Sequence, residues 1–368
     1  MKKTLISIFA IALMLALTMP AAADVGDISL YGNVRMSTFY LDRSKEQAPA
    51  PNLFDDKDLQ WELDRGSSRF GVKFKRDSVG ARIEIRPRSD SYVRHWHAYW
   101  NFGAGTLVVG QAYTPTGEVN IASCCIEGGY SGDYGDTAGS SRQPLLELQF
   151  PIGAGKLRLA AIEPNTLDAG SVVAAATDTD TTLPKIEASF DLAFGPAAIT
   201  LFGGYNTYDE VVTATDKDYS LDGYLFGGNV RFAQGPFYIK GIIWTAQNEK
   251  EYGLDNPAGF NASYDAASDS VTDVDTMGYF AVVGFKMSDK VTWELGYGAV
   301  KHERDRPGFL SDKDESAYYY LSVPIKVAKN VTITPEIGKL DEKDRVVNGV
   351  STEEGDSVYY GAYWRINF

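Results

Sequence analysis

Residues 144–163 read PLLELQFPIGAGKLRLAAIE, two short runs joined by a turn. In the first run Leu146, Leu148 and Phe150 alternate with Glu147 and Gln149. Successive side chains of a β-strand point to opposite faces, so this run predicts a strand with one apolar and one polar face. The short connection at residues 151–155 predicts a tight hairpin to the next strand.

The same alternation recurs before and after this hairpin. It predicts sixteen strands, at residues 28–41, 60–75, 80–88, 92–102, 105–111, 144–150, 156–163, 184–194, 197–208, 219–233, 236–247, 274–287, 290–302, 315–328, 330–340 and 356–368. The connections alternate between short turns, such as residues 195–196, and long polar loops, such as residues 248–273. Short turns on one rim and long loops on the other are typical of an outer-membrane β-barrel, whose short rim is periplasmic.

Alternation alone also fits a soluble sandwich or propeller, because a soluble antiparallel sheet buries one face and wets the other. We favour the membrane barrel because the apolar faces continue without helical cover and the loop lengths are asymmetric. Aromatic clusters near strand ends are also expected at the level of the lipid headgroups. The residues concerned are Tyr318, Tyr319, Tyr320, Tyr359, Tyr360, Tyr363 and Trp364.

The longest irregular stretch covers residues 112–141 and shows no sustained period of a helix or a strand. It is rich in glycine and contains four carboxylates and two adjacent cysteines. A structureless loop of this length is uncommon in a compact domain and is usually functional. We predict that this third long loop folds into the barrel and narrows an aqueous channel.

The N-terminus predicts export. Lys2 and Lys3 precede an apolar run at residues 5–19 and three alanines, the pattern of a signal peptide. We therefore expect a signal peptide at residues 1–23 and one barrel domain at residues 24–368. The net charge of −14 makes a nucleic-acid partner unlikely, since such domains carry a basic face. The mean hydropathy of −0.21 argues against a helical membrane protein.

Several short motifs carry a resemblance to a known family. They are Leu30-Tyr31-Gly32, Ser68-Arg69-Phe70-Gly71, the strand at residues 94–99, the segment 105–111, and a last strand that ends in Phe368 with Ile366, Trp364 and Tyr360 on the same face. With these motifs the chain resembles the general porins of Gram-negative outer membranes. The resemblance implies a trimer of sixteen-stranded barrels in the outer membrane, through which small hydrophilic solutes and ions diffuse passively. It also implies that Tyr360, Trp364, Ile366 and Phe368 are a signal for the barrel-assembly machinery. Gln111, the cysteine pair, Trp96 and Trp100 depart from the family pattern.

Alternation assigns a group of basic residues on the early strands to the lumen. They are Arg35, Arg69, Lys73, Arg82, Arg86 and Arg94. The resemblance implies that they form a basic wall facing acids of the infolded loop, with Glu118, Glu127, Asp133 and Asp136 as candidates. The alternative is that they are ordinary solvated lumen charges, some of them paired, as Glu84 could be with Arg82 or Arg86.

Two further features leave alternatives open. Cys124 and Cys125 could form a strained vicinal disulfide, bridge to another chain, or be an ordinary loop pair. Acidic residues gather in two long loops and could bind Ca²⁺ or bridge to lipopolysaccharide, although a solvated acidic surface is the default. They are Asp265, Asp269, Asp273, Asp275, Asp341, Glu342, Asp344, Glu353 and Glu354. No other cofactor or metal is expected.

The leading functional hypothesis is a passive porin, and a substrate-selective channel is its closest rival. A surface adhesin would instead use the long loops. An outer-membrane enzyme has no support in the sequence, because none of the three histidines lies beside an obvious serine or acid partner. Net charge is acidic while the early lumen wall is basic, so the sign of ion selectivity stays open.

Overall fold

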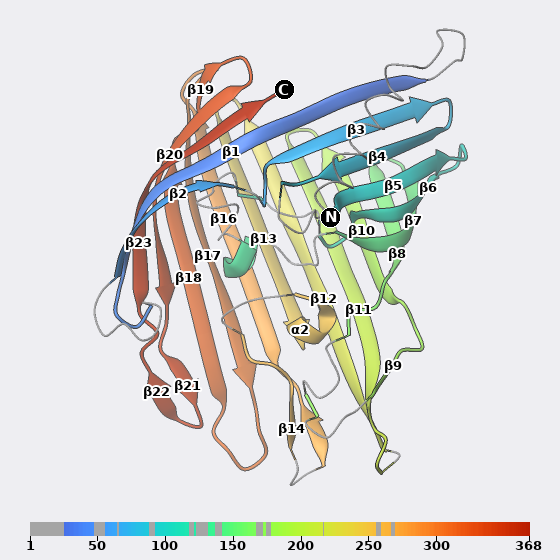
Figure 1. Ribbon diagram of the computed structural model, residues 1–368, viewed down its shortest axis with the longest axis vertical. Helices are drawn as coiled ribbons and strands as arrows, with labels where there is room; N and C mark the ends of the chain where they lie inside the picture. Colours follow the sequence, from blue (N-terminus) through green and yellow to red (C-terminus); the bar gives the residue numbers. More distant parts are fainter. Residues whose placement is uncertain are drawn as a thin grey trace, which may run out of the picture.

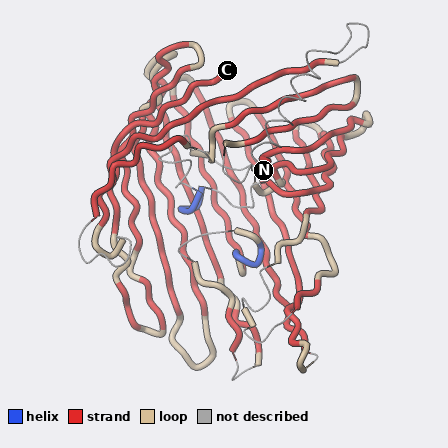
Figure 2. Tube along the Cα trace, viewed as in Figure 1, coloured by secondary structure: helices blue, strands red, loops and turns tan. Residues whose placement is uncertain are grey.

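The structure is a closed antiparallel barrel whose first and last strands pair with each other. The register runs from Asn33 opposite Asn367 to Arg43 opposite Ser357. This computed structural model describes residues 26–47, 56–64, 66–87, 93–117, 121–122, 132–136, 142–166, 172–173, 178–215, 217–254, 259–265 and 269–368. Twenty-one strand segments hydrogen-bond in one sheet and together make sixteen barrel strands. Figure 2 shows that nearly all of the described chain is strand.

The strands follow each other around the barrel in chain order (Figure 1). The first half contains β1 (Asp27–Arg43), β2 (Asp56–Leu63), β3 (Arg69–Arg76), β4 (Val79–Ile85), β5 (Val93–Asn101), β6 (Thr106–Tyr113), β7 (Arg142–Ile152), β8 (Gly155–Ile162), β9 (Asp178–Asp180) and β10 (Lys185–Phe194). The second half contains β11 (Ala197–Val212), β12 (Lys217–Gln234), β13 (Phe237–Gln247), β16 (Asp275–Lys286), β17 (Thr292–Arg304), β18 (Asp312–Ser322), β19 (Ile325–Ala328), β20 (Val331–Glu342), β21 (Arg345–Val347), β22 (Val350–Thr352) and β23 (Asp356–Asn367). The predicted count of sixteen strands is confirmed.

Two barrel strands are interrupted where the sequence predicted continuous ones. β2 and β3 both pair with β1, and the break between them follows Asp64. Asp64 accepts a hydrogen bond from the backbone N–H of Ser67 (2.7 Å) and one from the hydroxyl of Tyr363, which stabilises the turn between the two segments. β18 and β19 likewise form one strand against β20. The predicted strand at residues 80–88 ends earlier, at Ile85.

The two rims differ in the length of their connections. The upper rim in Figure 1 carries tight turns, among them those at Gly195 and Gly235, whose φ angles of +56° and +59° favour glycine. The C-terminus lies at the same rim. The lower rim carries the long connections, which include the hairpins β14 (Ser263–Asp265) with β15 (Ser270–Thr272) and β21 with β22. The predicted asymmetry is therefore present, and residues 1–23, the expected signal peptide, lie outside the described residues.

Strand alternation separates an apolar outer face from an inner face. In β16 the outward Met277 and Val283 are 44% and 51% exposed, whereas the inward Phe280 and Val282 are 1% and 0% exposed. The prediction that all seven aromatic residues near the strand ends lie at the lipid headgroups is therefore wrong in part. Tyr319, Tyr360 and Trp364 do face outward, but the hydroxyl-bearing rings of four neighbours are buried on the inner face. Those four are Tyr318, Tyr320, Tyr359 and Tyr363, which the two-residue repeat places opposite the outward set.

Two loop segments cover the inner face of the later strands. The turn η2 (Gly132–Asp136), from the third long loop, packs against β13, β16, β17 and β18, on the far side of the barrel from β5. Trp244 donates its indole N–H to the carbonyl of Gly135 (3.1 Å), and the ring of Tyr134 packs at a 40° tilt against that of Tyr318 (5.6 Å between ring centroids). The short helix α2 (Glu249–Tyr252) packs against β11 and β12. Figure 2 shows both turns in blue.

A network of buried side chains ties these loops to the wall. Glu187 of β10 accepts hydrogen bonds from the backbone N–H of Thr116 (3.0 Å) and the hydroxyl of Tyr252 (2.9 Å). Lys185, fully buried, pairs with Glu187 (3.1 Å) and donates to the carbonyl of Tyr252 (2.8 Å).

Among the described helices, none is both long enough and apolar enough to cross a membrane.

The packing of η2 against β17 depends on glycine at position 298. A Cβ atom on Gly298 would lie 2.4 Å from the carbonyl oxygen of Tyr134 and 2.0 Å from the ring of Phe280. We predict that Gly298→Ala lowers the free energy of unfolding by about 1–3 kcal/mol, the usual cost of overpacking. Chemical unfolding of the refolded barrel in detergent measures it. Gly241→Ala is the matched control, because its Cβ would meet no atom closer than 3.7 Å. Equal losses of unfolding free energy in the two variants would contradict the proposed role of Gly298 in the packing of η2.

Candidate functional site

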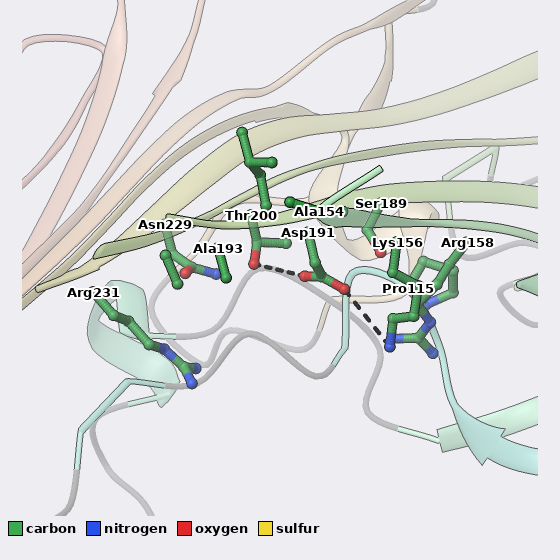
Figure 3. Close-up of a pocket in the computed structure, with 13 residues that line it drawn as sticks. Pro115, Ala154, Lys156, Arg158, Ser189, Asp191, Ala193, Thr200, Asn229 and Arg231 are labelled. Atoms are coloured by element: carbon green, nitrogen blue, oxygen red, sulfur yellow. Dashed lines mark hydrogen bonds and ion pairs between the residues drawn. The ribbon is translucent and has the colours of Figure 1, made fainter. Parts of the chain in front are cut away.

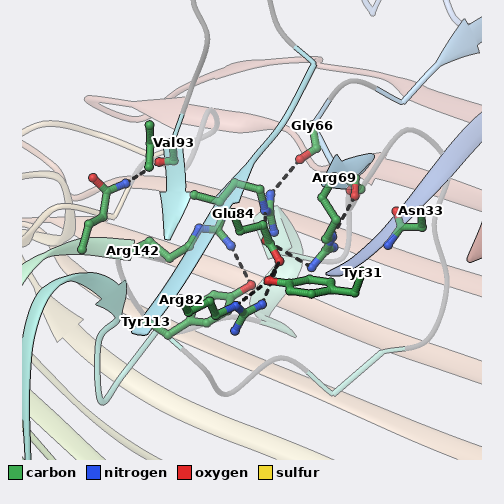
Figure 4. Close-up of polar contacts among 12 residues, drawn as sticks. Tyr31, Asn33, Gly66, Arg69, Arg82, Glu84, Val93, Tyr113 and Arg142 are labelled. Carbon is green, nitrogen blue, oxygen red and sulfur yellow. Dashed lines mark hydrogen bonds and ion pairs between the residues drawn. The ribbon is translucent and has the colours of Figure 1, made fainter. Parts of the chain in front are cut away.

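Three early arginines converge on one carboxylate at the inner face of the barrel. Arg69 comes from β3, Arg82 and Glu84 from β4, and Arg94 from β5 (Figure 4). A bulge shifts the register between β4 and β5, so that Glu84 lies opposite His95 and Ile85 opposite Val93. The residue skipped by this shift is Arg94, which turns toward Glu84.

The contacts to Glu84 are short and come from several directions. Arg82 and Arg94 each donate to this carboxylate at 2.8 Å, and Arg69 lies 3.7 Å from it. The hydroxyl of Tyr31 also donates to Glu84 (2.8 Å) and accepts from the Nε of Arg82 (2.7 Å). Three guanidinium groups thus share one carboxylate, which leaves two positive charges in excess.

The carboxylate and the guanidinium groups of this cluster differ in how much of each side chain is exposed. The side chain of Glu84 is 0% exposed, while those of Arg69 and Arg82 are 19% and 27% exposed. The carboxylate therefore lies behind the guanidinium groups. The guanidinium groups are the more exposed part of this cluster.

The remaining predicted basic residues lie around this cluster. The Nε of Arg35 donates to the side-chain oxygen of Asn33 (3.0 Å). Lys73 lies over the ring of Tyr31, 5.1 Å from its centroid. Arg86 is half-buried. The structure therefore pairs Glu84 with Arg82, as one alternative held, and adds Arg94, Arg69 and Tyr31 to the group.

The predicted loop acids are only partly described. Asp136 is fully buried and accepts hydrogen bonds from the backbone N–H groups of Ile121 (2.7 Å) and Ala122 (3.1 Å), so it braces the loop. Asp133 belongs to η2. Four predicted residues lie outside the described part of the chain, namely Glu118, Glu127, Cys124 and Cys125.

The inner wall opposite the arginines was not predicted as a site. There Glu294 accepts hydrogen bonds from Tyr238 and Tyr320 (2.6 Å each), and Lys240 lies 3.7 Å away. Nearer the arginines, beside the seam of the barrel, Tyr359 of β23 donates to Glu336 of β20 (2.7 Å) in the same way. The signal was present in the sequence, because each of these residues occupies an inward position of its strand, but assigning the tyrosines to the lipid headgroups hid it.

Several acidic residues of the long loops pair with basic residues. Hydrogen bonds from Lys217, Tyr219 and Tyr264 lower the pKa of Asp269 to about 2. Arg345 lies 3.8 Å from Glu354, and Lys343 pairs with Asp341. Among the described residues no three acidic, histidine or cysteine side chains are grouped to hold a metal ion.

The last strand presents the predicted C-terminal residues on its outer face. Tyr360, Trp364, Ile366 and Phe368 are 54%, 42%, 53% and 63% exposed. The backbone of Phe368 forms two hydrogen bonds with Gly32, at 2.9 and 3.0 Å. The outward side chains therefore lie directly beside the seam where the barrel closes.

Solved structures share this architecture. The outer-membrane channel DcaP of Acinetobacter baumannii is 16% identical, with a TM-score of 0.66, covering 94% of this chain and 99% of that one. The anion-selective porin from Comamonas acidovorans is 14% identical, with a TM-score of 0.65, covering 93% and 99%. The trimer form of OmpT, an outer membrane protein of Vibrio cholerae, is 16% identical, with a TM-score of 0.57, covering 94% and 100%. At these identities the likeness shows the fold.

Comparison of the sequence with curated proteins found no match. A family model described as Gram-negative porin matches residues 10–345, most of the chain. That match agrees with the closed sixteen-stranded barrel. The chain belongs to the Gram-negative porin family and is a channel of the outer membrane.

Proposed function

We propose that the channel lets small hydrophilic solutes diffuse passively, without catalysis, and that it favours anions. The observation that carries this proposal is the placement of Glu84 behind Arg69 and Arg82, which turns an excess of positive charge toward the lumen. Charges that line the narrow part of a pore set its ion selectivity. The net negative charge of the whole chain matters less, because exposed charges beyond about 10 Å are largely screened by salt.

The covered inner face supports a path beside the basic wall. Inward side chains on the far strands, such as Phe280, Val300 and Tyr318, are at most 1% exposed, and η2 packs over this region. The third long loop would therefore occupy the far side of the lumen and narrow the water-filled space next to the arginines. The anion-selective porin of Comamonas acidovorans has the same sign of selectivity.

We predict that Arg69→Ser with Arg82→Ser shifts the selectivity toward cations. Each removed charge contributes about 1 kcal/mol to an ion passing at 4 Å in water-like surroundings, so the anion-to-cation permeability ratio should fall several-fold. The reversal potential of planar bilayers under a salt gradient measures this ratio. Lys290→Ser with Lys329→Ser removes the same charge from two exposed turns and should leave the ratio unchanged. An unchanged reversal potential in the arginine variant would exclude the basic wall as the selectivity element.

Strand length supports a homotrimer with a defined contact face. A strand needs about 9–11 residues to span the hydrocarbon when tilted. β4 and β6 have 7 and 8 residues, whereas β11 and β12 have 16 and 18. The early wall is therefore too short to be covered well by lipid alone, and we infer that neighbouring copies cover it. OmpT of Vibrio cholerae, which has a similar fold, is known in a trimer form.

We predict that Trp96→Arg, on the outer face of β5, converts trimers to monomers. The residue is 60% exposed in one chain, and an arginine there would be buried without a partner between copies. Native gels and chemical cross-linking in mild detergent measure the oligomeric state. Leu201→Arg on β11, which is 58% exposed, is the matched control: it should weaken membrane insertion by about 2–4 kcal/mol and leave detergent-extracted trimers intact. Trimers that tolerate Trp96→Arg but not Leu201→Arg would move the interface to the later strands.

The outward C-terminal residues would be read by the barrel-assembly machinery after the signal peptide has been removed near Asp24. The long-loop rim would then face lipopolysaccharide. We predict that deletion of Phe368 lowers the amount of folded protein in the outer membrane, because it removes both an exposed ring and two seam hydrogen bonds. Heat-modifiable mobility of membrane fractions measures folding. Phe368→Ala removes the ring and keeps the backbone hydrogen bonds, so it separates the two effects. A normal yield of folded protein from both variants would show that Phe368 is not part of an assembly signal.

A further inference from the structure

A polar hollow lies on the inner face near the short-turn rim, between β8, β10, β11 and β12 (Figure 3). Its volume is about 460 Å³, and Pro115 at the start of the third long loop also lines it. It lies at the short-turn rim, which we assign to the periplasm, and on other strands than the arginine cluster around Glu84. A solute that crosses the proposed channel would meet this hollow at the short-turn end.

The charged residues of the hollow follow one row across the sheet. Lys156 pairs in register with Asp191, Asp191 with Thr200, and Thr200 with Asn229. Neighbouring strands lie about 4.8 Å apart, so these side chains are close neighbours on one surface. Arg231 occupies the next inward position of β12 after Asn229 and is exposed. Figure 3 shows Arg231 and Lys156 on either side of Asp191.

Asp191 is held in place and still reachable. Its Oδ1 accepts the hydroxyl of Thr200 (2.7 Å), and its Oδ2 lies 3.7 Å from the Nζ of Lys156. The side chains of Asp191 and Lys156 are 40% and 47% exposed. An ionised carboxylate offers about four acceptor positions, so Asp191 can accept further donors.

Arg158 takes no direct part in this surface. It donates two hydrogen bonds to Glu147 (2.8 and 2.9 Å) and one to the carbonyl of Tyr113 (2.9 Å), and its side chain is only 6% exposed. Its charge is therefore compensated within the wall. The accessible charges of the hollow are those of Lys156, Arg231 and Asp191.

We propose that this hollow is a binding subsite for small zwitterions of the amino-acid type. The carboxylate of the solute would lie against Arg231 or Lys156, and its ammonium group would donate to Asp191. A simple anion would meet the negative charge of Asp191, and a simple cation would meet two positive charges, so only a zwitterion is complementary to the whole surface. This inference rests on the proposed channel function and adds a solute class to it.

The test uses glycine and acetate as probes on the purified channel in planar bilayers. Glycine is electrically neutral, so a saturable decrease of the KCl current with glycine concentration reports occupancy. We expect glycine to reduce the current at lower concentration than sodium acetate. Asp191→Asn should weaken glycine binding roughly tenfold, because the amide oxygen can still accept a hydrogen bond but lacks the negative charge that strengthens the bond from the ammonium group. The same variant should leave acetate binding equal or stronger.

Arg231→Gln should weaken the binding of both probes, and Lys290→Gln, in an exposed turn outside the hollow, should change neither. Heat-modifiable mobility confirms that each variant is folded. Equal glycine affinity in the wild type and in Asp191→Asn, or acetate binding as tight as glycine in the wild type, would overturn the subsite. The reversal potential without probes judges the anion-selective channel separately, so the two proposals can fail independently.

Discussion

Closure of the sheet between β1 and β23 is the constraint on which the rest of the structure depends. Inside a bilayer no water can pair with an exposed backbone group, so a spanning sheet must have no free edge. Here the seam continues to the last residue, where Phe368 exchanges two backbone hydrogen bonds with Gly32. Gly32 is suited to this position because a Cβ atom would lie 2.6 Å from the ring of Phe368. The residue that ends the chain therefore also completes the barrel.

Once the barrel is closed, the two-residue repeat divides every strand between lipid and lumen. The outer face must be apolar, which leaves the inner face free to carry charge. A barrel of sixteen strands is too wide for inward side chains alone to fill it. Loop segments fill part of this space: η2 packs on the later strands and α2 on β11 and β12. Each does so through buried polar contacts, such as Trp244 to Gly135 and Asn206 to Glu251. The lumen therefore has a packed side and a charged side.

The sequence predicts the strands well because lipid imposes a simple pattern on them, as at Leu146, Glu147 and Leu148. It predicts less where an inward residue is also apolar, because the pattern then no longer distinguishes the faces. Tyr318 and Tyr320 are such residues: consecutive tyrosines suggest an interface belt, yet only Tyr319 points outward. The break after Asp64 is stabilised in part by Tyr363, nearly 300 positions away, and the bulge that turns Arg94 toward Glu84 depends on the register with β4. Such pairings are long-range and leave no local signal.

The arginine cluster shows why a basic wall requires an acid within it. Three guanidinium groups from adjacent strands repel one another, and that repulsion would turn them away from a common point. Burying a carboxylate among them is costly unless its oxygens are well paired. Glu84 meets that condition, because Arg82, Arg94 and Tyr31 all donate to it at 2.8 Å. The carboxylate removes one positive charge from the lumen, but it fixes the positions of the guanidinium groups that remain exposed. In the proposed channel, such a fixed array of charge would act on every solute in the same place, which flexible side chains would not achieve.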